Sequence, residues 1–264
     1  MNSAEFAINK NIILAEEHDR ISCLIRDAQI EEFLCLYKDN SYENVSLAFS
    51  KAFKISPISP EMMKLCIKIN AQNSPGYSEP KETARIATPK NPLSLSALNK
   101  LTKGIGTVIL TEEADFRSCC EAVSSDTADY CIMPVCSSVD GYYPSFSKMI
   151  KAYDLKICKS ERISKADSDE ELQFALLSKD IEIPQKANFA LFSFVDEDRG
   201  TLPKLIDAFH KNGIDTVSVQ SSPLEFNMDR FEHKMEVSLK NHNPDALLFF
   251  LNSSLPGHIV LGIY

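Results

Sequence analysis

The sequence predicts an α/β protein (α+β overall) built from three consecutive parts. Residues 1–75 contain no glycine and carry apolar residues at helical spacing, which indicates helices. Between residues 83 and 180, short apolar runs alternate with helix-spaced segments, which favours a partly parallel sheet. From residue 186 to 264 the order is strand–helix–strand–strand–helix–strand, which predicts an antiparallel sheet with two helices on one face. We therefore expect domains at 1–78, 83–180 and 186–264.

The first part is predicted to contain three helices. A long helix from about Ala4 to Lys38 is followed by a break at Asp39–Ser41 and a shorter helix around residues 45–53. Ser59 and Pro60 then mark the start of a third helix, because a capping serine precedes a proline at the first helical position. The proline- and glycine-containing stretch 73–80 is a linker.

The middle part alternates strands with helices. Strands are predicted at Arg85–Thr88, Thr107–Leu110 and Tyr130–Val135, and helices at Leu95–Leu101 and Phe116–Val123. This alternation is typical of strands that run parallel to one another.

The C-terminal part has the strongest signals. An aromatic-rich strand over residues 188–195 is followed by a helix that opens at Gly200–Leu202 and stops at Asn212–Gly213. A second strand covers 214–219, and apolar residues alternate over 231–239 as in a strand with one buried face. Asn243–Pro244 begins the second helix, and residues 259–263 form the last strand.

Composition excludes several classes of function. The 264 residues carry 37 acidic and 28 basic side chains, a net charge of −9, which disfavours a nucleic-acid or anionic-membrane partner. No apolar run approaches the ~20 residues of a membrane span, and the first residues lack a secretory pattern, so a cytoplasmic protein is expected. Eight cysteines without a CxxC pair are expected to be reduced core residues, and five scattered histidines predict no metal site. Without a glycine-rich phosphate loop, no cofactor is expected.

Three short segments of the C-terminal part carry a family resemblance. They are Gly200-Thr201-Leu202, Gln220-Ser221-Ser222-Pro223 and Leu261-Gly262-Ile263-Tyr264. In this order they resemble the ACT regulatory domain at the end of prephenate dehydratases, which has a ferredoxin-like fold. In that family the first two segments hold phenylalanine at a dimer interface. The resemblance therefore implies a homodimer, and an amino-acid site at Gly200, Thr201, Leu202, Gln220, Ser221, Ser222 and Pro223.

The second of these segments departs from the family. Gln220 stands where the family has a carboxylate, and Ser222 stands where it has an arginine. Loss of a guanidinium removes a fixed fork of donors together with its charge. A module that folds and dimerises but binds nothing is the alternative interpretation.

The middle part resembles the first lobe of prephenate dehydratase, through Met133-Pro134-Val135-Cys136-Ser137-Ser138 and the following Gly141. The resemblance places family site positions at Ser94, Cys136, Ser137, Ser138, Leu172, Gln173 and Phe174. Leu172 and Gln173 stand where the family has a catalytic threonine and a substrate-holding arginine. Only eight residues separate Ile163 from Leu172, where the family has a second lobe. Dehydration needs a proton donor and a closed cleft, so we expect this activity to be lost.

The N-terminal helices resemble the chorismate mutase that precedes prephenate dehydratase in bifunctional proteins, mainly in position and helix pattern. That reaction needs basic side chains that clamp a dianionic substrate. The resemblance offers Arg20, Arg26 and Lys38 as mutase candidates. The alternative is that all three are solvated surface charges.

These observations predict a prephenate-dehydratase-like protein of phenylalanine metabolism that is catalytically degenerate. It would act as a regulatory, ligand-binding or interaction protein, a homodimer that takes a small amino acid or a prephenate-like ligand. The alternative is an active prephenate dehydratase or chorismate mutase. A third hypothesis, another reaction on a prephenate-like acid, would use Ser94, Ser137 and Ser138, although clustered loop serines more often form turns.

Overall fold

The computed structural model describes residues 3–36, 56–70, 77–78, 81–164, 169–196, 200–224 and 227–264. Its helices are α1 (Ser3–Leu36), α3 (Pro60–Asn70), α4 (Pro92–Leu101), α5 (Phe116–Ser124), α6 (Pro144–Ala152), α7 (Thr201–His210) and α8 (Pro244–Ser254). Its strands are β1 (Thr83–Pro89), β2 (Thr107–Glu113), β3 (Tyr130–Ser137), β4 (Gly141–Tyr142), β5 (Lys156–Ser164), β6 (Glu171–Ser178), β7 (Phe189–Asp196), β8 (Thr216–Leu224), β9 (Asn227–Ser238) and β10 (Ile259–Ile263). The mixed α/β fold class is confirmed.

The described strands form one mixed sheet in the order β2-β1-β3-β6-β5-β10-β7-β9-β8, with β4 paired to β3. β1 runs parallel to both β2 and β3, as the alternating pattern of the middle part predicts. β7, β8, β9 and β10 form the predicted antiparallel arrangement in the C-terminal part. The two halves meet where β10 pairs in parallel with β5, at Gly262 and Ile157.

Glycine at position 262 is required by this junction. A Cβ atom there would lie 2.3 Å from the carbonyl oxygen of Ile157 and 2.6 Å from its Cβ. Real Cβ atoms do not approach other atoms so closely, and a backbone oxygen cannot move aside as the tip of a flexible side chain can. The one residue pair that joins β5 to β10 therefore depends on the absence of a side chain.

Three buried clusters hold the elements on the sheet. One cluster lies under α4 and includes Ile86, Ile132 and Phe174. A second lies under α5 and α6 and extends across the junction to Leu191 and Leu261. The predicted core cysteines Cys66, Cys119, Cys120, Cys131 and Cys158 are buried. The helix α6 was not predicted from the sequence.

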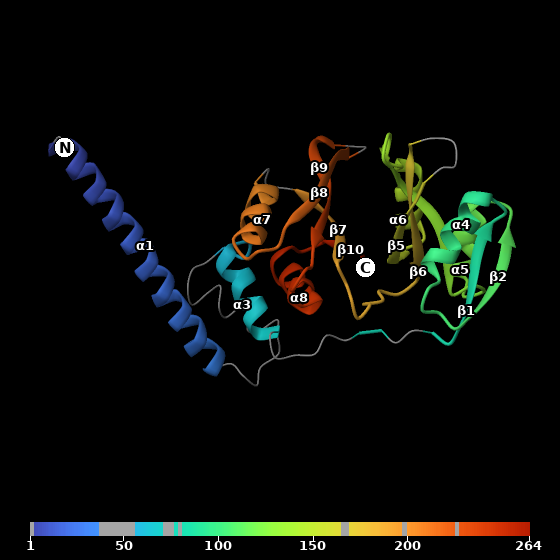
Figure 1. Ribbon diagram of the computed structural model, residues 1–264, viewed down its shortest axis with the longest axis horizontal. Helices are drawn as coiled ribbons and strands as arrows, with labels where there is room; N and C mark the ends of the chain where they lie inside the picture. The colour runs from blue at the N-terminus through green and yellow to red at the C-terminus, as the bar shows by residue number, and fades with distance from the viewer. Residues whose placement is uncertain are drawn as a thin grey trace.

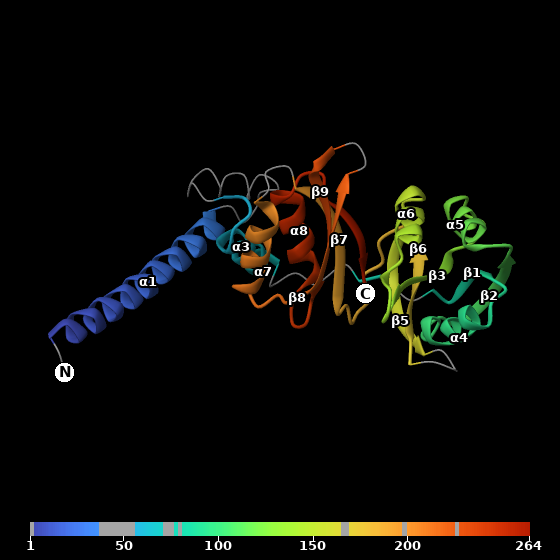
Figure 2. The same cartoon turned by 90° about the horizontal axis from the view of Figure 1, so that it is seen from above.

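The third cluster covers one face of the C-terminal strands, where α7 and α8 pack as predicted and α3 joins them. Met62, Met63 and Cys66 of α3 are fully buried there. The side-chain amide of Asn212 donates to the carbonyl of Pro60 at 2.9 Å, which fixes α3 against the end of α7. Figures 1 and 2 show α3, α7 and α8 on one side of these strands and α6 on the other. The helix α3, which the sequence groups with residues 1–78, thus packs on the C-terminal part.

The predicted long first helix is confirmed as α1, which extends away from the rest of the protein (Figure 1). Ile30 is buried in the third cluster, to which α3 also belongs, whereas Ile12, Ile13 and Leu24 are about half exposed or more. The expected helix at residues 45–53 and most of the 73–80 linker lie outside the described residues. Within the described parts of the chain, no helix is long and apolar enough to cross a membrane.

Candidate functional site

A chain of polar contacts links the two segments that the sequence assigns to an amino-acid site. Ser221 Oγ lies 2.8 Å from His233 Nδ1, and the opposite ring nitrogen, His233 Nε2, lies 3.8 Å from Asp196 Oδ2. The other carboxylate oxygen of Asp196 accepts the backbone N–H of Thr201 at 3.4 Å. The start of α7 is thereby connected to β8 through residues of β7 and β9.

The strand register explains why these side chains meet. Ser221 and His233 are direct partners between β8 and β9, and His233 is also the partner of Phe194 on β7. Side chains of directly paired residues project to the same face of a sheet. Asp196 is the last residue of β7, so its carboxylate lies beside the first turn of α7.

His233 is held between aromatic rings. Its ring centroid lies 5.2 Å from that of Phe194 and 6.4 Å from that of Phe231. His233 is only 7% exposed, whereas Ser221 is exposed. The rings fix the imidazole, so its orientation toward Ser221 is set by packing and not by solvent.

Asp196 is arranged to stay ionised. Burial raises the pKa of its carboxyl group, but hydrogen bonds from Thr201 and the backbone N–H of Leu202 outweigh it, so the pKa lies below its usual value. The N-terminal end of a helix also favours a negative charge. Asp196 therefore offers a buried, charged acceptor beside a histidine.

Sequence reasoning missed Asp196 and His233. The alternation over 231–239 places His233 on the buried face of its strand, and His233 is buried, but a periodic pattern does not identify its partner across the strand. The signal that was available is a histidine at a position that alternation places inside the core.

The strand register divides the four residues of the second segment between the two faces of β8, although all four also line one groove, described below. Ser221 and Pro223 are paired with His233 and Phe231, while Gln220 and Ser222 are paired with Lys234 and Glu232. Alternation puts the first pair on the helix-covered face and the second pair on the opposite face. Gly200, Thr201 and Leu202 lie at the start of α7, on the same face as Ser221.

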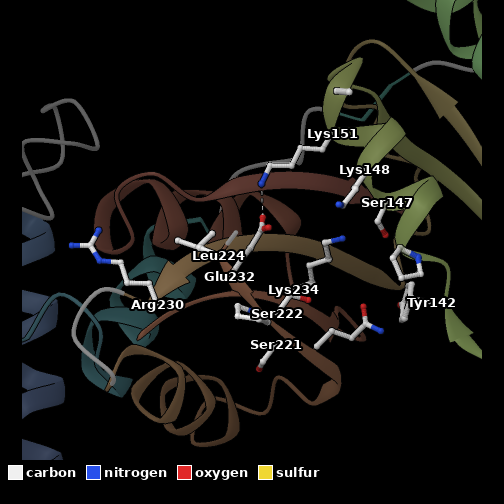
Figure 3. Close-up of a pocket in the computed structure, with 14 residues that line it drawn as sticks. Tyr142, Ser147, Lys148, Lys151, Ser221, Ser222, Leu224, Arg230, Glu232 and Lys234 are labelled. Carbon is white, nitrogen blue, oxygen red and sulfur yellow. Dashed lines mark hydrogen bonds and ion pairs between the residues drawn. The ribbon is translucent and has the colours of Figure 1, made fainter. Parts of the chain in front are cut away.

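The opposite face of β8 and β9 forms one wall of a groove of about 890 Å³, and α6 forms the other (Figure 3). It is lined by Tyr142, Pro144, Ser147, Lys148, Lys151, Ala152, Gln220, Ser221, Ser222, Pro223, Leu224, Arg230, Glu232 and Lys234. Lys151 Nζ forms an ion pair with Glu232 Oε1 at 2.7 Å, so α6 is tied to β9 across the groove.

The hydroxyl groups of Ser137 and Ser138 in the middle part are engaged in hydrogen bonds within the protein. Ser137 Oγ accepts the backbone N–H groups of Val139 and Asp140 at 3.1 and 3.3 Å and donates to Glu170 at 2.8 Å. Ser138 Oγ accepts the N–H of Glu171 at 3.0 Å. The contacts of Ser137 with Val139 and Asp140 are those of a turn-forming serine, and the contact of Ser138 ties this turn to β6.

The remaining dehydratase-like positions are packed or internally bonded. Leu172 and Phe174 are 6% and 2% exposed within the α4 cluster, and Gln173 Nε2 donates to Ser160 Oγ at 2.6 Å. Ser94 is fully buried, and its hydroxyl has no hydrogen-bond partner within the described chain. Cys136 is half-buried, and burial raises the pKa of its thiol. A raised thiol pKa disfavours the nucleophilic thiolate.

Of the three mutase candidates, Arg20 can be placed. Its guanidinium donates to Glu17 at 2.7 and 3.0 Å, and both side chains are at least half exposed. Such a pair on a helix surface is worth only a few tenths of a kcal/mol, roughly 0.2–0.5. The side chain of Arg26 and the whole of Lys38 lie outside the described residues.

Comparison with known proteins gives similarity at the level of the fold. No family model matches the sequence, and no curated protein matches it significantly. A prephenate dehydratase from Streptococcus mutans has 18% identity and a TM-score of 0.55, over 69% of this chain and 97% of that one. GqqA, a novel type of quorum quenching acylase, has 18% identity and a TM-score of 0.53, over 68% of this chain and 94% of that one.

A third structure is a prephenate dehydratase from Arthrobacter aurescens in complex with L-Phe. It has 12% identity and a TM-score of 0.51, over 68% of this chain and 89% of that one. At these identities the comparisons show a prephenate-dehydratase-like fold. They do not extend to activity or ligand.

Proposed function

We propose that this protein is a prephenate-dehydratase-like protein that no longer dehydrates prephenate and that binds a small L-amino acid through its C-terminal part. The observation that carries the proposal is the contact chain from Ser221 through His233 to Asp196 and Thr201. It brings together the two segments that the ACT resemblance assigns to an amino-acid site. One of the similar structures is titled as a complex with L-Phe, which agrees with this ligand class.

The chemistry of the chain suits a zwitterion. The Asp196 carboxylate can accept from an ammonium group, while the Ser221 hydroxyl can donate to a carboxylate and its oxygen can accept from His233 Nδ1. Hydrogen bonds that involve a charged group contribute more than neutral ones, about 1.5–3 kcal/mol each. A ligand with both charges at one carbon could use both ends of the chain.

The middle part supports the loss of dehydratase activity. Leu172 and Gln173 offer neither the hydroxyl nor the guanidinium of the family motif, and Ser137 and Ser138 are bonded to backbone groups. A general acid must be within reach of the leaving hydroxyl in order to donate its proton. The proposed role is therefore regulatory, in a homodimer formed through the C-terminal part.

The test is isothermal titration of the full chain with phenylalanine, tyrosine and tryptophan, beside an assay for prephenate turnover. We expect one of the amino acids to bind and His233→Phe to weaken its binding by roughly tenfold, since about 1.4 kcal/mol is lost with one polar contact. Phenylalanine at 233 keeps the aromatic packing, so the fold should survive. The control His210→Phe changes an exposed histidine at the end of α7.

Either of two results would contradict the proposal. One is prephenate turnover at the rate of an ordinary dehydratase. The other is amino-acid binding that His233→Phe and His210→Phe leave equally unchanged. Light scattering of the same sample tests the homodimer.

A further inference from the structure

The groove between α6 and the face of β8 and β9 opposite the helices is lined by more basic than acidic side chains, although the protein as a whole is acidic. Among the described residues, its lining contains the basic residues Lys148, Lys151, Arg230 and Lys234, and one carboxylate, that of Glu232. The whole chain carries a net charge of −9. A positive groove on an acidic protein concentrates small anions locally, because the low-dielectric walls focus the field.

The basic residues come from both walls. Pro144, Ser147, Lys148 and Lys151 follow helical spacing on α6, and they present one face of that helix to the groove. Lys234 and Arg230 belong to β9 on the opposite wall. Figure 3 shows Lys148 and Lys151 reaching from α6 toward the strands, with Lys234 below them and Arg230 at the far end. An anion in the middle of the groove would meet lysines from two separate elements.

Lys234 is set differently from a surface lysine. It is half-buried on the outer face of the sheet, and its strand partner is Gln220. Burial lowers the pKa of its ammonium group, Lys151 lowers it further, and Glu232 opposes both. A bound anion would compensate for the water that this ammonium group has lost.

The groove also has the dimensions and polar groups of a ligand site. Its volume of about 890 Å³ falls in the range of small-molecule sites, roughly 300–1,000 Å³. The hydroxyls of Ser147 and Ser222, the phenol of Tyr142 and the amide of Gln220 add neutral hydrogen-bonding groups. Lysine ammonium groups bind phosphates and carboxylates as point charges.

We infer that this groove binds a small organic anion with two or more negative charges, either a phosphate ester or a polycarboxylate, held between Lys148 and Lys151 of α6 and Lys234 of β9. Gln220, Ser221, Ser222 and Pro223 of the second segment also line this groove, but the lysines take no part in the contact chain from Ser221 to Thr201. Lys234 and Glu232 lie on the opposite face of the sheet from His233. Because α6 belongs to the middle part and β9 to the C-terminal part, the bound anion joins the two halves of the protein.

The Lys151–Glu232 ion pair allows a test in which two substitutions are expected to change anion affinity in opposite directions. Glu232 lies across the groove from α6 and competes with any anion for Lys151. Its side chain is 18% exposed, so its charge is only partly screened by water. Removing that charge should tighten anion binding, whereas removing a lysine should weaken it. A variant that merely damaged the fold would weaken binding in both cases.

The experiment is isothermal titration of the full chain with pyrophosphate and with citrate, at low and at physiological salt. We expect at least one probe to bind, with an affinity that falls as salt rises. Lys148→Met and Lys234→Met should each weaken it by roughly tenfold, as expected for the loss of a charged hydrogen bond. Glu232→Gln should strengthen it severalfold. Tighter binding of pyrophosphate indicates that the natural ligand is a phosphate ester, and tighter binding of citrate indicates a polycarboxylate.

Lys211→Met is the matched control, because Lys211 is an exposed lysine that follows α7, paired with Asp207 at 3.1 Å. It should leave the affinity for the probe unchanged. The inference is overturned if neither probe binds at low salt. It is also overturned if Lys148→Met and Lys234→Met bind the probe as tightly as Lys211→Met does. Amino-acid binding should be unchanged in all the lysine variants, so failure here leaves the proposed function standing.

Discussion

The two halves of the sheet use their polar residues in different ways. In the middle part, Ser137 is 2% exposed and its hydroxyl is bonded to two backbone N–H groups and to Glu170. In the C-terminal part, Ser221 is exposed and its hydroxyl contacts the ring of His233. Both serines occupy positions that a family resemblance marks as functional. Only the second is arranged so that a ligand could replace or extend its contacts.

The difference teaches how to separate a position kept for folding from one that can still bind. A hydroxyl that satisfies backbone donors stabilises a turn, and a ligand that displaced it would leave those donors unpaired at a cost of about 1–3 kcal/mol each. The contact between Ser221 and the buried ring of His233 can open without such a cost if the ligand itself pairs with the ring nitrogen. By this criterion Ser137 and Ser138 belong to the fold, and Ser221 belongs to a site.

The largest expected effect comes from breaking the junction between the halves. Gly262→Ala would place a Cβ 2.3 Å from the carbonyl oxygen of Ile157, so β10 must move away from β5. We expect the free energy of unfolding to fall by about 3 kcal/mol. Urea denaturation measures it.

Gly257→Ala is the control for that change. Gly257 has a φ of +76°, and an added Cβ meets nothing within 4 Å, so the cost is backbone strain alone, about 1 kcal/mol. If both variants lose the same stability, the junction does not depend on the close approach of β10 to β5.

The second prediction restores the family motif in the middle part. Leu172→Thr places a hydroxyl where a 6% exposed leucine packs in the α4 cluster, and it should lower the free energy of unfolding by about 2–3 kcal/mol. The double variant Leu172→Thr/Gln173→Arg should still not turn over prephenate. Unfolding followed by circular dichroism measures the change in stability, and an enzyme assay measures prephenate turnover.

Gln173→Arg alone provides the comparison, since it loses the bond to Ser160 Oγ and little packing, which costs about 1 kcal/mol. Prephenate turnover in the double variant would show that the middle part has kept a working site, and the contrast between the halves would fail.

Local sequence signals predicted the elements well. The cap at Ser59 is present, with its hydroxyl accepting the N–H of Met62 at 3.2 Å, and Asn243 accepts the N–H of Asp245 at 2.9 Å. Alternation over 231–239 correctly predicted burial of His233, Met235, Val237 and Leu239, but Phe231 is exposed, and Glu236 and Ser238 on the other face are buried as well. Each of these rests on residues within a few positions of one another, which a sequence pattern can report.

Long-range pairings could not be predicted in this way. The β5–β10 contact joins residues 157 and 262, and α3 packs on helices more than a hundred positions away. Neither has a periodic signal, because the apolar face of α3 would look the same against any partner. The site residues Asp196 and His233 were missed for this reason: their significance comes from β7 and β9 lying side by side.

The smallest expected effect also compares the two halves, because each contains an aspartate that accepts a backbone N–H from the first turn of a helix. Hydrogen bonds from Ser118 lower the pKa of Asp115 at the start of α5. For Asp196, burial raises the pKa, but the hydrogen bonds from Thr201 lower it by more, so the pKa lies below its usual value. A carboxyl group whose pKa is lower in the folded state stabilises the fold above its unfolded pKa, about 3.9, and this contribution is lost as pH falls through the folded value.

Asp196→Asn should therefore lower stability at pH 7 by about 1 kcal/mol, because the neutral amide loses the negative charge beside the start of α7, and the difference from the native protein should shrink as the pH falls below about 4. For Asp115→Asn, the difference in stability from the native protein should likewise shrink as the pH falls. Thermal unfolding between pH 2 and 7 measures both variants. The two variants should differ in amino-acid binding: Asp196→Asn should weaken it, and Asp115→Asn should leave it unchanged. If both variants bind equally well, Asp196 is only a helix cap. The C-terminal half would then use its polar residues as the middle part does.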